Sequence, residues 1–365
     1  MSKTIPWWSP QMTGDEQTLI RHVLDSNYLN DGDITTRFEQ EIARLVGAKY
    51  AVAVTSGTAA LFLALAGLGV GSGDEVIVPD VTFIATANAV RLAGASPVLV
   101  DIDPATLNIS PETLAKAITA RTKAVIPVHV SGRGANMSAI MEIARKHDLH
   151  VIEDAAEAFM SALDDKYLGT FGHAGCLSFS PNKTITTGQG GMILTNDDAL
   201  HSRLRELKDQ GRAVRGTGGD DIHNSVGYNF KLTNLQAAVG LGQLSALQQR
   251  IERQRRVYKL YAENLEGLPG ITLFGFRLDT GEVPQWTDAL VQRRDELEQY
   301  LLARRIHCRR FWFPIHTQAP YRLPDNAFPN STRLMPHALW LPSAFTLTDD
   351  DVLAVCRHIR EFLSL

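Results

Sequence analysis

Between residues 49 and 210 the chain alternates short apolar segments with longer segments of helical periodicity. These segments predict strands at 50–54, 75–78, 97–100, 124–129 and 150–153, and helices at 58–67, 83–92, 111–119 and 138–147. The predicted strands are rich in β-branched residues and apolar on both faces, which is typical of strands buried in a parallel sheet. Right-handed crossovers through the helices then build a three-layer α/β domain.

The second half of the chain has a different pattern. Residues 205–235 are polar, rich in glycine and without periodicity, which predicts a mobile loop. A long helix is predicted over 235–265, and mixed strand-like and helical segments follow, ending in a helix at 349–362. We therefore expect a large domain over residues 1–249 and a smaller α+β domain over residues 250–365.

The composition excludes several classes of protein. The chain has 365 residues, 44% hydrophobic and 21% charged, with a formal net charge of −4, so it can form a large core and offers no basic surface for nucleic acid. Its three cysteines, Cys176, Cys308 and Cys356, lack the spacing of a zinc site or a disulfide scaffold. No apolar run approaches the roughly 20 residues that a membrane span needs. We expect a cytoplasmic protein with no metal and no membrane contact.

One lysine stands between two predicted strands in a segment that is otherwise apolar and rich in threonine and glycine. Lys183 follows an apolar run that ends at Phe179, and a second apolar run begins at Met192. Lysine is rarely placed there for packing, and partial desolvation makes its amine a better nucleophile toward carbonyls. A Schiff base with pyridoxal phosphate requires such an amine. A lysine that extends from a loop into solvent explains this segment equally well.

Residues suited to a cofactor also follow other predicted strands at their carboxyl ends, where open parallel sheets bind ligands. After the first strand, Ser56, Gly57 and Thr58 open a helix, and small residues there expose backbone N–H groups to a phosphate. After the second strand, Phe83 is placed to stack on a flat ring. Each feature alone also has an ordinary explanation, namely a helix cap and a core phenylalanine.

The fifth predicted strand ends in two acidic residues, and a third follows one helical turn later. Asp154 is placed to face a pyridinium nitrogen, where an ionised carboxylate keeps the ring protonated and electron-withdrawing. A magnesium-binding aspartate is the alternative, but it needs a GxxxxGK[ST] motif, which the chain lacks. Glu157 is placed either to contact the ring oxygen or to start a helix. In combination with Ser178 and Lys183, these residues indicate a pyridoxal-phosphate site more specifically than any one of them does alone.

Several long motifs run through nearly the whole chain. They include Ser56-Gly-Thr-Ala-Ala-Leu61, Gly73-Asp-Glu-Val-Ile-Val-Pro79, Glu153-Asp-Ala-Ala-Glu-Ala158, Lys183-Thr-Ile-Thr-Thr-Gly-Gln-Gly-Gly191, Gly227-Tyr-Asn-Phe-Lys-Leu-Thr-Asn234 and Phe313-Pro-Ile-His316. They resemble the DegT/DnrJ/EryC1/StrS family of sugar aminotransferases, which are pyridoxal-phosphate enzymes of the aspartate-aminotransferase fold (fold type I). The motifs that begin at Lys183 and at Gly227 are most similar to those of GDP-perosamine synthases. These enzymes aminate C4 of a GDP-linked 4-keto-6-deoxy sugar, usually with glutamate as the amine donor.

The resemblance implies a role for each matching residue. Lys183 would bind pyridoxal 5′-phosphate covalently and then carry protons, and Asp154 would pair with its pyridine nitrogen. The other implied cofactor contacts are Gly57, Thr58 and Ser178 at the phosphate, Phe83 over the ring and Glu157 near the ring oxygen. Asn229 would reach the phosphate in the neighbouring subunit of a homodimer with shared active sites. His316, Lys231, Gly32 and the 210–225 loop would lie near the nucleotide sugar.

Some positions depart from the family pattern. Gln189 stands where glutamate is commoner, and Lys231 stands where many members carry arginine, which is not interchangeable with lysine at a bidentate site. These departures lie on the substrate side and leave the particular sugar open. We expect an aminotransferase that moves an amine from glutamate to the C4 ketone of a nucleotide-linked 4-keto-6-deoxy sugar. The alternatives are another keto sugar or a cyclitol as acceptor, a sugar dehydratase, which would carry histidine in place of Lys183, and a non-catalytic sensor on the same fold.

Overall fold

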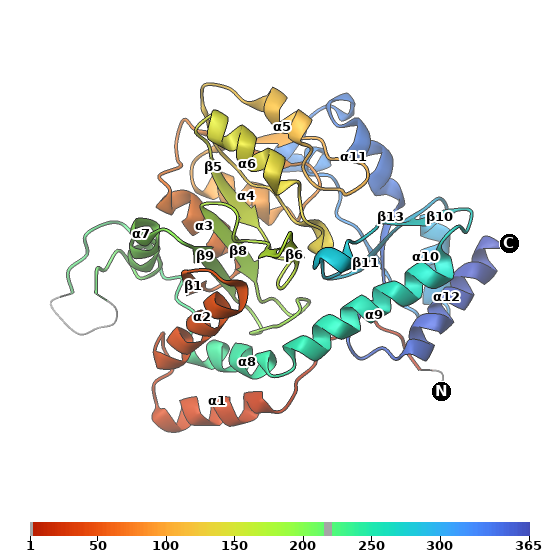
Figure 1. Ribbon diagram of the computed structural model, residues 1–365, viewed down its shortest axis with the longest axis horizontal. Coiled ribbons are helices and arrows are strands. Elements are labelled where there is room, and N and C mark those ends of the chain that lie inside the picture. The colour runs from red at the N-terminus through yellow and green to blue at the C-terminus, as the bar shows by residue number, and fades with distance from the viewer. Residues whose placement is uncertain (1–2, 215–220) are drawn as a thin grey trace.

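The computed structural model describes residues 3–214 and 221–365, and its largest unit is a sheet of seven strands between two layers of helices (Figure 1). In spatial order the strands are β1 (Tyr50–Val54), β9 (Gly191–Thr195), β8 (Ala174–Ser178), β5 (His150–Asp154), β4 (Thr122–Val125), β2 (Glu75–Pro79) and β3 (Ser96–Val100). Neighbouring strands are parallel except that β9 runs antiparallel to both β1 and β8. The mainly parallel sheet is therefore confirmed.

Successive residues of these strands belong to two separate apolar cores, as expected for a sheet that is covered on both faces. For example, Val151 and Ile152 are neighbours on β5, yet each belongs to a different core. One face is covered by α3 (Gly57–Gly67), α4 (Ala85–Leu92) and α7 (Asp198–Lys208), and the other by α2 (Asp33–Val46), α5 (Pro111–Ala117), α6 (Met137–Lys146) and α8 (Asn234–Leu244). This is the predicted three-layer arrangement.

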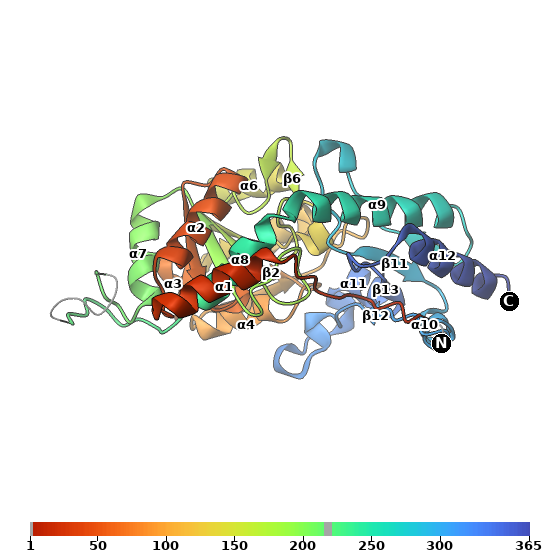
Figure 2. The ribbon, with the colours of Figure 1, turned by 90° about the horizontal axis from the view of Figure 1, so that it is seen from below.

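The single long helix predicted over 235–265 is wrong, because the chain changes direction at Ser245 and Ala246. The structure has two helices, α8 and then α9 (Leu247–Leu265). A glycine, Gly240, lets α8 pack closely on α2, since a Cβ there would lie 2.6 Å from the Phe38 ring. α8 also packs along α1 (Asp15–Ser26). Packing thus aligns α8 with the large sheet, whereas α9 leads to the second half of the chain (Figure 2).

A second, antiparallel sheet follows, with the order β10 (Ile271–Leu273), β11 (Thr287–Val291), β13 (Ala338–Leu341) and β12 (Arg309–Arg310). It shares a core with α9, α10 (Arg294–Leu302) and α12 (Asp349–Leu363). Shorter elements are β6 (Ala162–Leu163), β7 (Lys166–Tyr167) and α11 (Pro329–Leu334). The predicted domain boundary at residues 249 and 250 falls near the start of α9, and the division into two domains stays a prediction.

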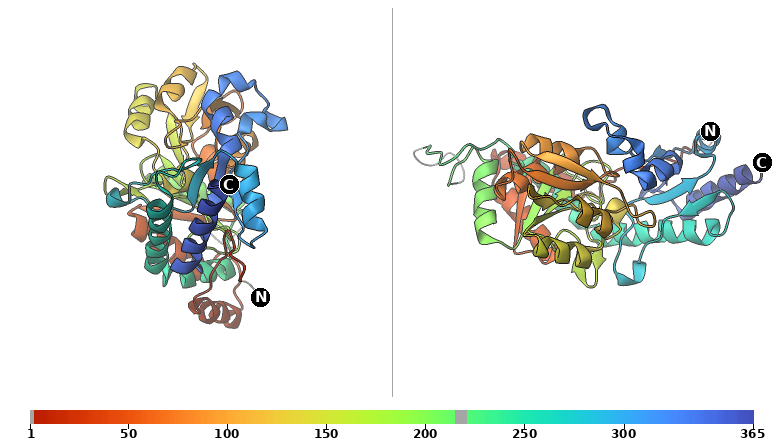
Figure 3. Two further views of the ribbon diagram at one scale, coloured as in Figure 1. Left: turned by 90° about the vertical axis from the view of Figure 1, so that its right-hand side faces the viewer. Right: turned by 90° about the horizontal axis from the view of Figure 1, so that it is seen from above.

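The N-terminal segment connects the two sheets. Ile5 pairs with Ile306 beside the second sheet, whereas α1 and α2 pack against α8. Both ends of the chain lie at the end of the molecule that carries the second sheet (Figure 3). Of the loop predicted around 210–225, residues 215–220 lie outside the described residues. Among the residues that the structure describes, no helix combines the length and the apolar character needed to cross a membrane.

Candidate active site

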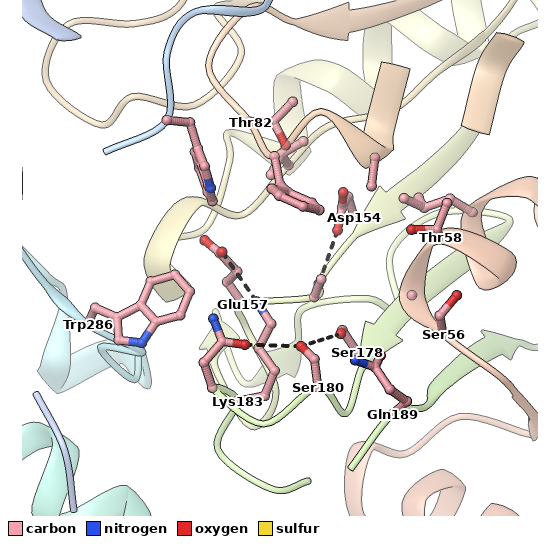
Figure 4. Close-up of a pocket in the computed structure, with 18 of the residues that line it drawn as sticks. Ser56, Thr58, Thr82, Asp154, Glu157, Ser178, Ser180, Lys183, Gln189 and Trp286 are labelled. Carbon is pink, nitrogen blue, oxygen red and sulfur yellow. Dashed lines mark hydrogen bonds and ion pairs between the residues drawn. The ribbon is translucent and has the colours of Figure 1, made fainter. Parts of the chain in front are cut away.

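A cavity of about 280 Å³ lies at the carboxyl ends of β5 and β8, between the start of α3 and the second sheet (Figure 4). The predicted residues in its lining are Gly57, Thr58, Phe83, Asp154, Glu157, Ser178 and Lys183. The other lining residues are Ser56, Leu61, Thr82, Ala85, Val128, Ala156, Ser180, Asn182, Gln189, Trp286, Arg309, Trp312 and Trp340. The fold thus brings every predicted cofactor contact except Asn229 into one cavity.

One end of the cavity is formed by the first turn of α3. Ser56 is the N-cap, and its side chain accepts a hydrogen bond from the Ala59 N–H at 3.1 Å. The N–H groups of Gly57 and Thr58 belong to the first turn, where backbone donors have no acceptor inside the helix. Gly57 also permits a close approach to β8, because a Cβ there would lie 3.1 Å from the Ser178 Cβ. Backbone donors, two hydroxyl groups and a positive helix end suit this region to a phosphate.

Asp154 is the last residue of β5, and hydrogen bonds hold both oxygens of its carboxylate. The Thr86 hydroxyl donates to Oδ2 over 2.8 Å, and the Ala156 N–H donates to Oδ1 over 3.2 Å. Burial raises the pKa of the Asp154 carboxyl above its usual range, although these hydrogen bonds and the nearby charge of Lys183 act in the opposite direction. The ionised carboxylate therefore needs a further positive partner, and the cavity offers room for one.

Lys183 lies on the connection between β8 and β9, and its backbone N–H donates to the Ser180 carbonyl over 3.1 Å. Its Nζ is 3.3 Å from Glu157 Oε1 and 4.9 Å from the ring centre of Trp286. The side chain is only 11% exposed. The alternative interpretation, a lysine extended into solvent, is therefore wrong, and its amine points into the cavity beside Glu157 (Figure 4).

Glu157 is buried beside Lys183, three residues after the end of β5. The Ser131 N–H donates to its Oε2 over 3.0 Å, and its Oε1 faces Lys183. Burial raises the pKa of the Glu157 carboxyl, and the charge of Lys183 partly offsets this. An amine and a carboxylate at this distance inside a cavity can hold and transfer a proton between them.

Phe83 precedes α4 at the open side of the cavity. It is 54% exposed although it lines the cavity. A phenylalanine that packs in the core, its ordinary explanation, is thereby excluded. An exposed aromatic face at the mouth of a polar cavity is suited to stack on a flat ring.

His316 lies away from the cavity and is fully buried. Its Nδ1 is 2.6 Å from Asp80 Oδ2, its Nε2 is 3.3 Å from Asp325 Oδ1, and its ring stacks on Phe328 with 4.5 Å between ring centres. Asp80 follows β2 directly. In this structure His316 therefore attaches the second half of the chain to the loop that carries Phe83, and a contact with substrate stays a prediction.

Asn229, Lys231 and Gly32 are also absent from the cavity lining. Lys231 forms an ion pair with Asp209, whose backbone pairs with that of Asn229. The Gly32 N–H donates to the Asn234 side chain over 3.1 Å. These residues lie together near the start of α2 and the end of α7, and a contact of any of them with cofactor or substrate stays a prediction.

Sequence reasoning missed the wall of the cavity that comes from the second sheet. Trp286, Arg309, Trp312 and Trp340 form this wall. The aromatic run 311–313 directly before the recognised Pro-Ile-His motif was an available signal for Trp312. No local motif marks Trp286 or Arg309, because their approach to Lys183 depends on how the second sheet packs against the first.

With this geometry in place, comparison with known proteins identifies the family. The sequence profile of the DegT/DnrJ/EryC1/StrS aminotransferase family matches residues 10–360. The chain belongs to this family. GDP-perosamine synthases of Escherichia coli O157:H7 and Caulobacter vibrioides are each 38% identical to it, over 99% and 97% of both sequences respectively. The S. venezuelae DesV structure, solved in complex with a ketimine intermediate, superposes with a TM-score of 0.91 at 36% identity and covers 96% of this chain and 94% of that one.

This family member is a pyridoxal-phosphate-dependent aminotransferase of fold type I, as predicted. The cavity fits the cofactor on its own evidence. The α3 N-terminus is suited to the phosphate, the buried Asp154 lacks the positive partner that a protonated ring nitrogen provides, and Lys183 offers a shielded amine for the aldehyde. Among the described residues, no three His, Cys, Asp or Glu side chains gather closely enough to hold a metal ion.

Proposed function

We propose that this enzyme transfers an amine from glutamate to the C4 ketone of a nucleotide-linked 4-keto-6-deoxy sugar, as in perosamine synthesis. The observation that carries the proposal is the 38% identity to the GDP-perosamine synthase of Escherichia coli O157:H7 over 99% of both sequences. Two further GDP-perosamine synthases match over similar lengths. A polysaccharide role is in keeping with another relative, the spore coat polysaccharide biosynthesis protein SpsC of Bacillus subtilis, at 35% identity.

The residues of the cavity divide the work of such a reaction. When bound, pyridoxal phosphate supplies a carbonyl that accepts an amine and a ring that withdraws electrons. The first turn of α3 and Ser178 would hold the phosphate, and Phe83 would keep water from one face of the ring. Asp154 would hold a positive charge on the ring nitrogen. Lys183 would move the proton between carbon atoms of the cofactor and the substrate, with Glu157 next to its amine to stabilise the protonated form.

A panel of nucleotide keto sugars tests the proposed substrate. Purified enzyme with glutamate should convert GDP-4-keto-6-deoxymannose to an amino sugar, which is detected by the mass of the product. Other GDP- or TDP-linked keto sugars should react more slowly by about 100-fold or more, because a site built for one sugar leaves buried polar groups unpaired with another. Faster turnover of a 3-keto sugar or of a cyclitol would show that the proposed acceptor is wrong.

We also propose a homodimer with shared active sites. Asn229 and Lys231 lie outside the cavity of their own chain, and the segment next to them exposes apolar side chains. Val214, Ile222 and Val226 are 68%, 60% and 83% exposed, and the described parts of this segment extend beyond α7, away from both sheets (Figure 2). An apolar segment of this kind suits an interface with a second copy, which would bring Asn229 to the phosphate in the partner's cavity.

Co-expression of two inactive variants tests the shared site. Lys183→Ala inactivates its own cavity, and Asn229→Asp sets a negative charge against the phosphate in the partner's cavity. Each homodimer should be nearly inactive, but a mixed dimer has one cavity with both changes and one with neither. Random pairing should therefore restore roughly a quarter of the wild-type activity, because half of the dimers are mixed and each has one intact site of two. Mixed dimers that gain no activity would show that Asn229 does not act across the interface.

A further inference from the structure

The charged residues that line the cavity are not all paired. Its carboxylates are those of Asp154 and Glu157, and its cationic side chains are Lys183 and Arg309. Lys183 lies beside Glu157, and Asp154 is the proposed partner of the ring nitrogen. Over residues 3–214 and 221–365, no carboxylate lies within ion-pair distance of Arg309. The cavity therefore keeps one positive charge for an anion that the chain itself does not supply.

The adjacent arginine, Arg310, has carboxylate partners, so the lack of one is particular to Arg309. Arg310 follows Arg309 on β12, but its side chain pairs with Asp295 at 3.2 Å and with Glu298 at 2.7 Å. Side chains alternate between the two faces of a strand. The two neighbours thus face different surroundings, one a cavity and the other an acidic surface.

Two tryptophans hold the Arg309 side chain in place. Its guanidinium carbon lies 4.8 Å from the ring centre of Trp7 and 5.6 Å from that of Trp340. Trp7 belongs to the N-terminal segment, which is fixed by the hydrogen bond from Ser343 N–H to the Trp7 carbonyl at 2.9 Å. A guanidinium stacked on aromatic rings keeps its N–H donors free at the edge of the plane, which is where a carboxylate binds with two hydrogen bonds.

The aromatic cluster also connects Arg309 to the reacting amine. Trp286 has its ring centre 4.9 Å from Lys183 Nζ and 5.4 Å from the ring centre of Trp7. Lys183 and Arg309 therefore contact the same group of rings and line the same cavity. A small molecule that places its amine at Lys183 can present a second group to Arg309.

Both substrates of the proposed reaction carry anionic groups, but they carry them at different distances from the reacting atom. An α-amino acid has a carboxylate on the carbon that bears its amine, so at least one carboxylate must enter the cavity. A nucleotide sugar carries its diphosphate at C1, across the sugar ring from a reacting C4, and therefore nearer to the outside. Arg309 lines the cavity that holds the Lys183 amine and shares its aromatic wall through Trp7 and Trp286, so it matches the amino acid better.

We propose that Arg309 binds a carboxylate of the amine donor, and that Trp7 positions its guanidinium for this contact. This rests on the proposed use of an amino-acid donor and goes beyond it by assigning the donor's binding residues. It also gives the N-terminal segment a part in donor recognition, although the segment contributes no group to the proposed chemistry.

The first half-reaction isolates this contact, because glutamate converts the holoenzyme to its aminated form without any sugar and the change is visible in the cofactor spectrum. Arg309→Gln should raise the glutamate concentration at half-maximal rate by about 10- to 100-fold, as expected for loss of a charge-assisted bidentate contact. Arg310→Gln is the matched control on the same strand. It should change the glutamate concentration at half-maximal rate by less than about twofold, as expected for an exposed ion pair. The second half-reaction, with nucleotide sugar and the aminated enzyme, should keep its substrate dependence in Arg309→Gln.

Glutarate gives a readout that does not need catalysis, because it has carboxylates but no amine. It should quench the tryptophan fluorescence of the wild-type holoenzyme, and Arg309→Gln should weaken this binding to a similar extent as glutamate binding. Trp7→Leu should weaken the binding of glutamate and of glutarate by a smaller factor. In a protein that already carries Arg309→Gln, Trp7→Leu should weaken binding little further, because Trp7 acts through Arg309.

Two results would overturn the assignment. In one, Arg309→Gln leaves both glutamate and glutarate dependence unchanged. In the other, it impairs the nucleotide sugar and spares the donor, which would place Arg309 at the diphosphate. Failure of the proposed function is seen separately, as a wild-type enzyme that accepts no nucleotide keto sugar, while the glutarate and glutamate titrations still decide the role of Arg309.

Discussion

Replacement of Lys183 by alanine should reduce transamination by more than about 10⁴-fold. Lys183 is the only lysine in the cavity lining, so among the described residues no other amine can replace it as covalent anchor and proton carrier. A positioned acid–base group alone contributes roughly 10²- to 10⁴-fold to a rate, and Lys183 also provides the nucleophile. The loss should appear in single-turnover measurements of each half-reaction, with glutamate and with the nucleotide sugar.

A conservative variant separates the chemistry of the amine from its charge. Lys183→Arg keeps a cation opposite Glu157, which Lys183 approaches to 3.3 Å, but a guanidinium cannot be deprotonated to act as the nucleophile. It should therefore be as inactive as Lys183→Ala while it unfolds at a temperature closer to that of the wild type. In the wild-type protein, borohydride should fix the pyridoxyl group to the peptide that contains Lys183. A label on any other lysine, or substantial activity in Lys183→Arg, would show that the assignment is wrong.

Much of the large sheet could be predicted because its determinants are local. Strand β1 and helix α12 have nearly the predicted bounds, since an apolar run and the Thr348 cap are visible in a short stretch of sequence. The cofactor end of the cavity was predictable for a related reason. In a parallel sheet, residues that end adjacent strands must lie at one edge, so the positions of Asp154 and Ser178 follow from the strand pattern once β5 and β8 are neighbours.

The wall of the cavity that carries Trp286 and Arg309 could not be predicted in this way. Trp7 lies hundreds of residues from Trp286 and Arg309 in the sequence, and it contacts them only because the N-terminal segment packs beside the second sheet. The break between α8 and α9 has a similar origin, because α8 packs against α1 and α2 whereas α9 packs in the core of the second sheet. For His316 the motif was recognised, but its burial against Asp80 was not visible in the sequence.

Asp154→Asn should lower the rate of transamination by several orders of magnitude while the protein remains folded. Loss of one preorganised electrostatic group typically costs about 10²- to 10³-fold. Here the cost should be at or above that range, because the protonated ring nitrogen depends on the carboxylate charge. Asparagine has nearly the same shape and can still bond to Thr86, whose hydroxyl lies 2.8 Å from Oδ2. The effect should therefore lie in the rates of both half-reactions, with little change in the donor concentration at half-maximal rate.

Stability measurements distinguish this electrostatic role from a structural one, because the two roles predict opposite results without cofactor. Burial raises the pKa of Asp154 in the folded chain, so folding favours the protonated acid. Any stability that this group contributes is present below the unfolded pKa of about 3.9 and is lost as the pH rises through the folded pKa. At pH 8, cofactor-free Asp154→Asn should therefore unfold at the same temperature as the wild type or at a higher one, and the difference should disappear toward pH 4.

With pyridoxal phosphate bound, the order of the unfolding temperatures should reverse, because only the wild type forms the charge pair with the ring. A cofactor-free variant that is clearly less stable than the wild type at pH 8, or one with a near-normal rate, would mean that Asp154 serves the fold rather than the ring nitrogen.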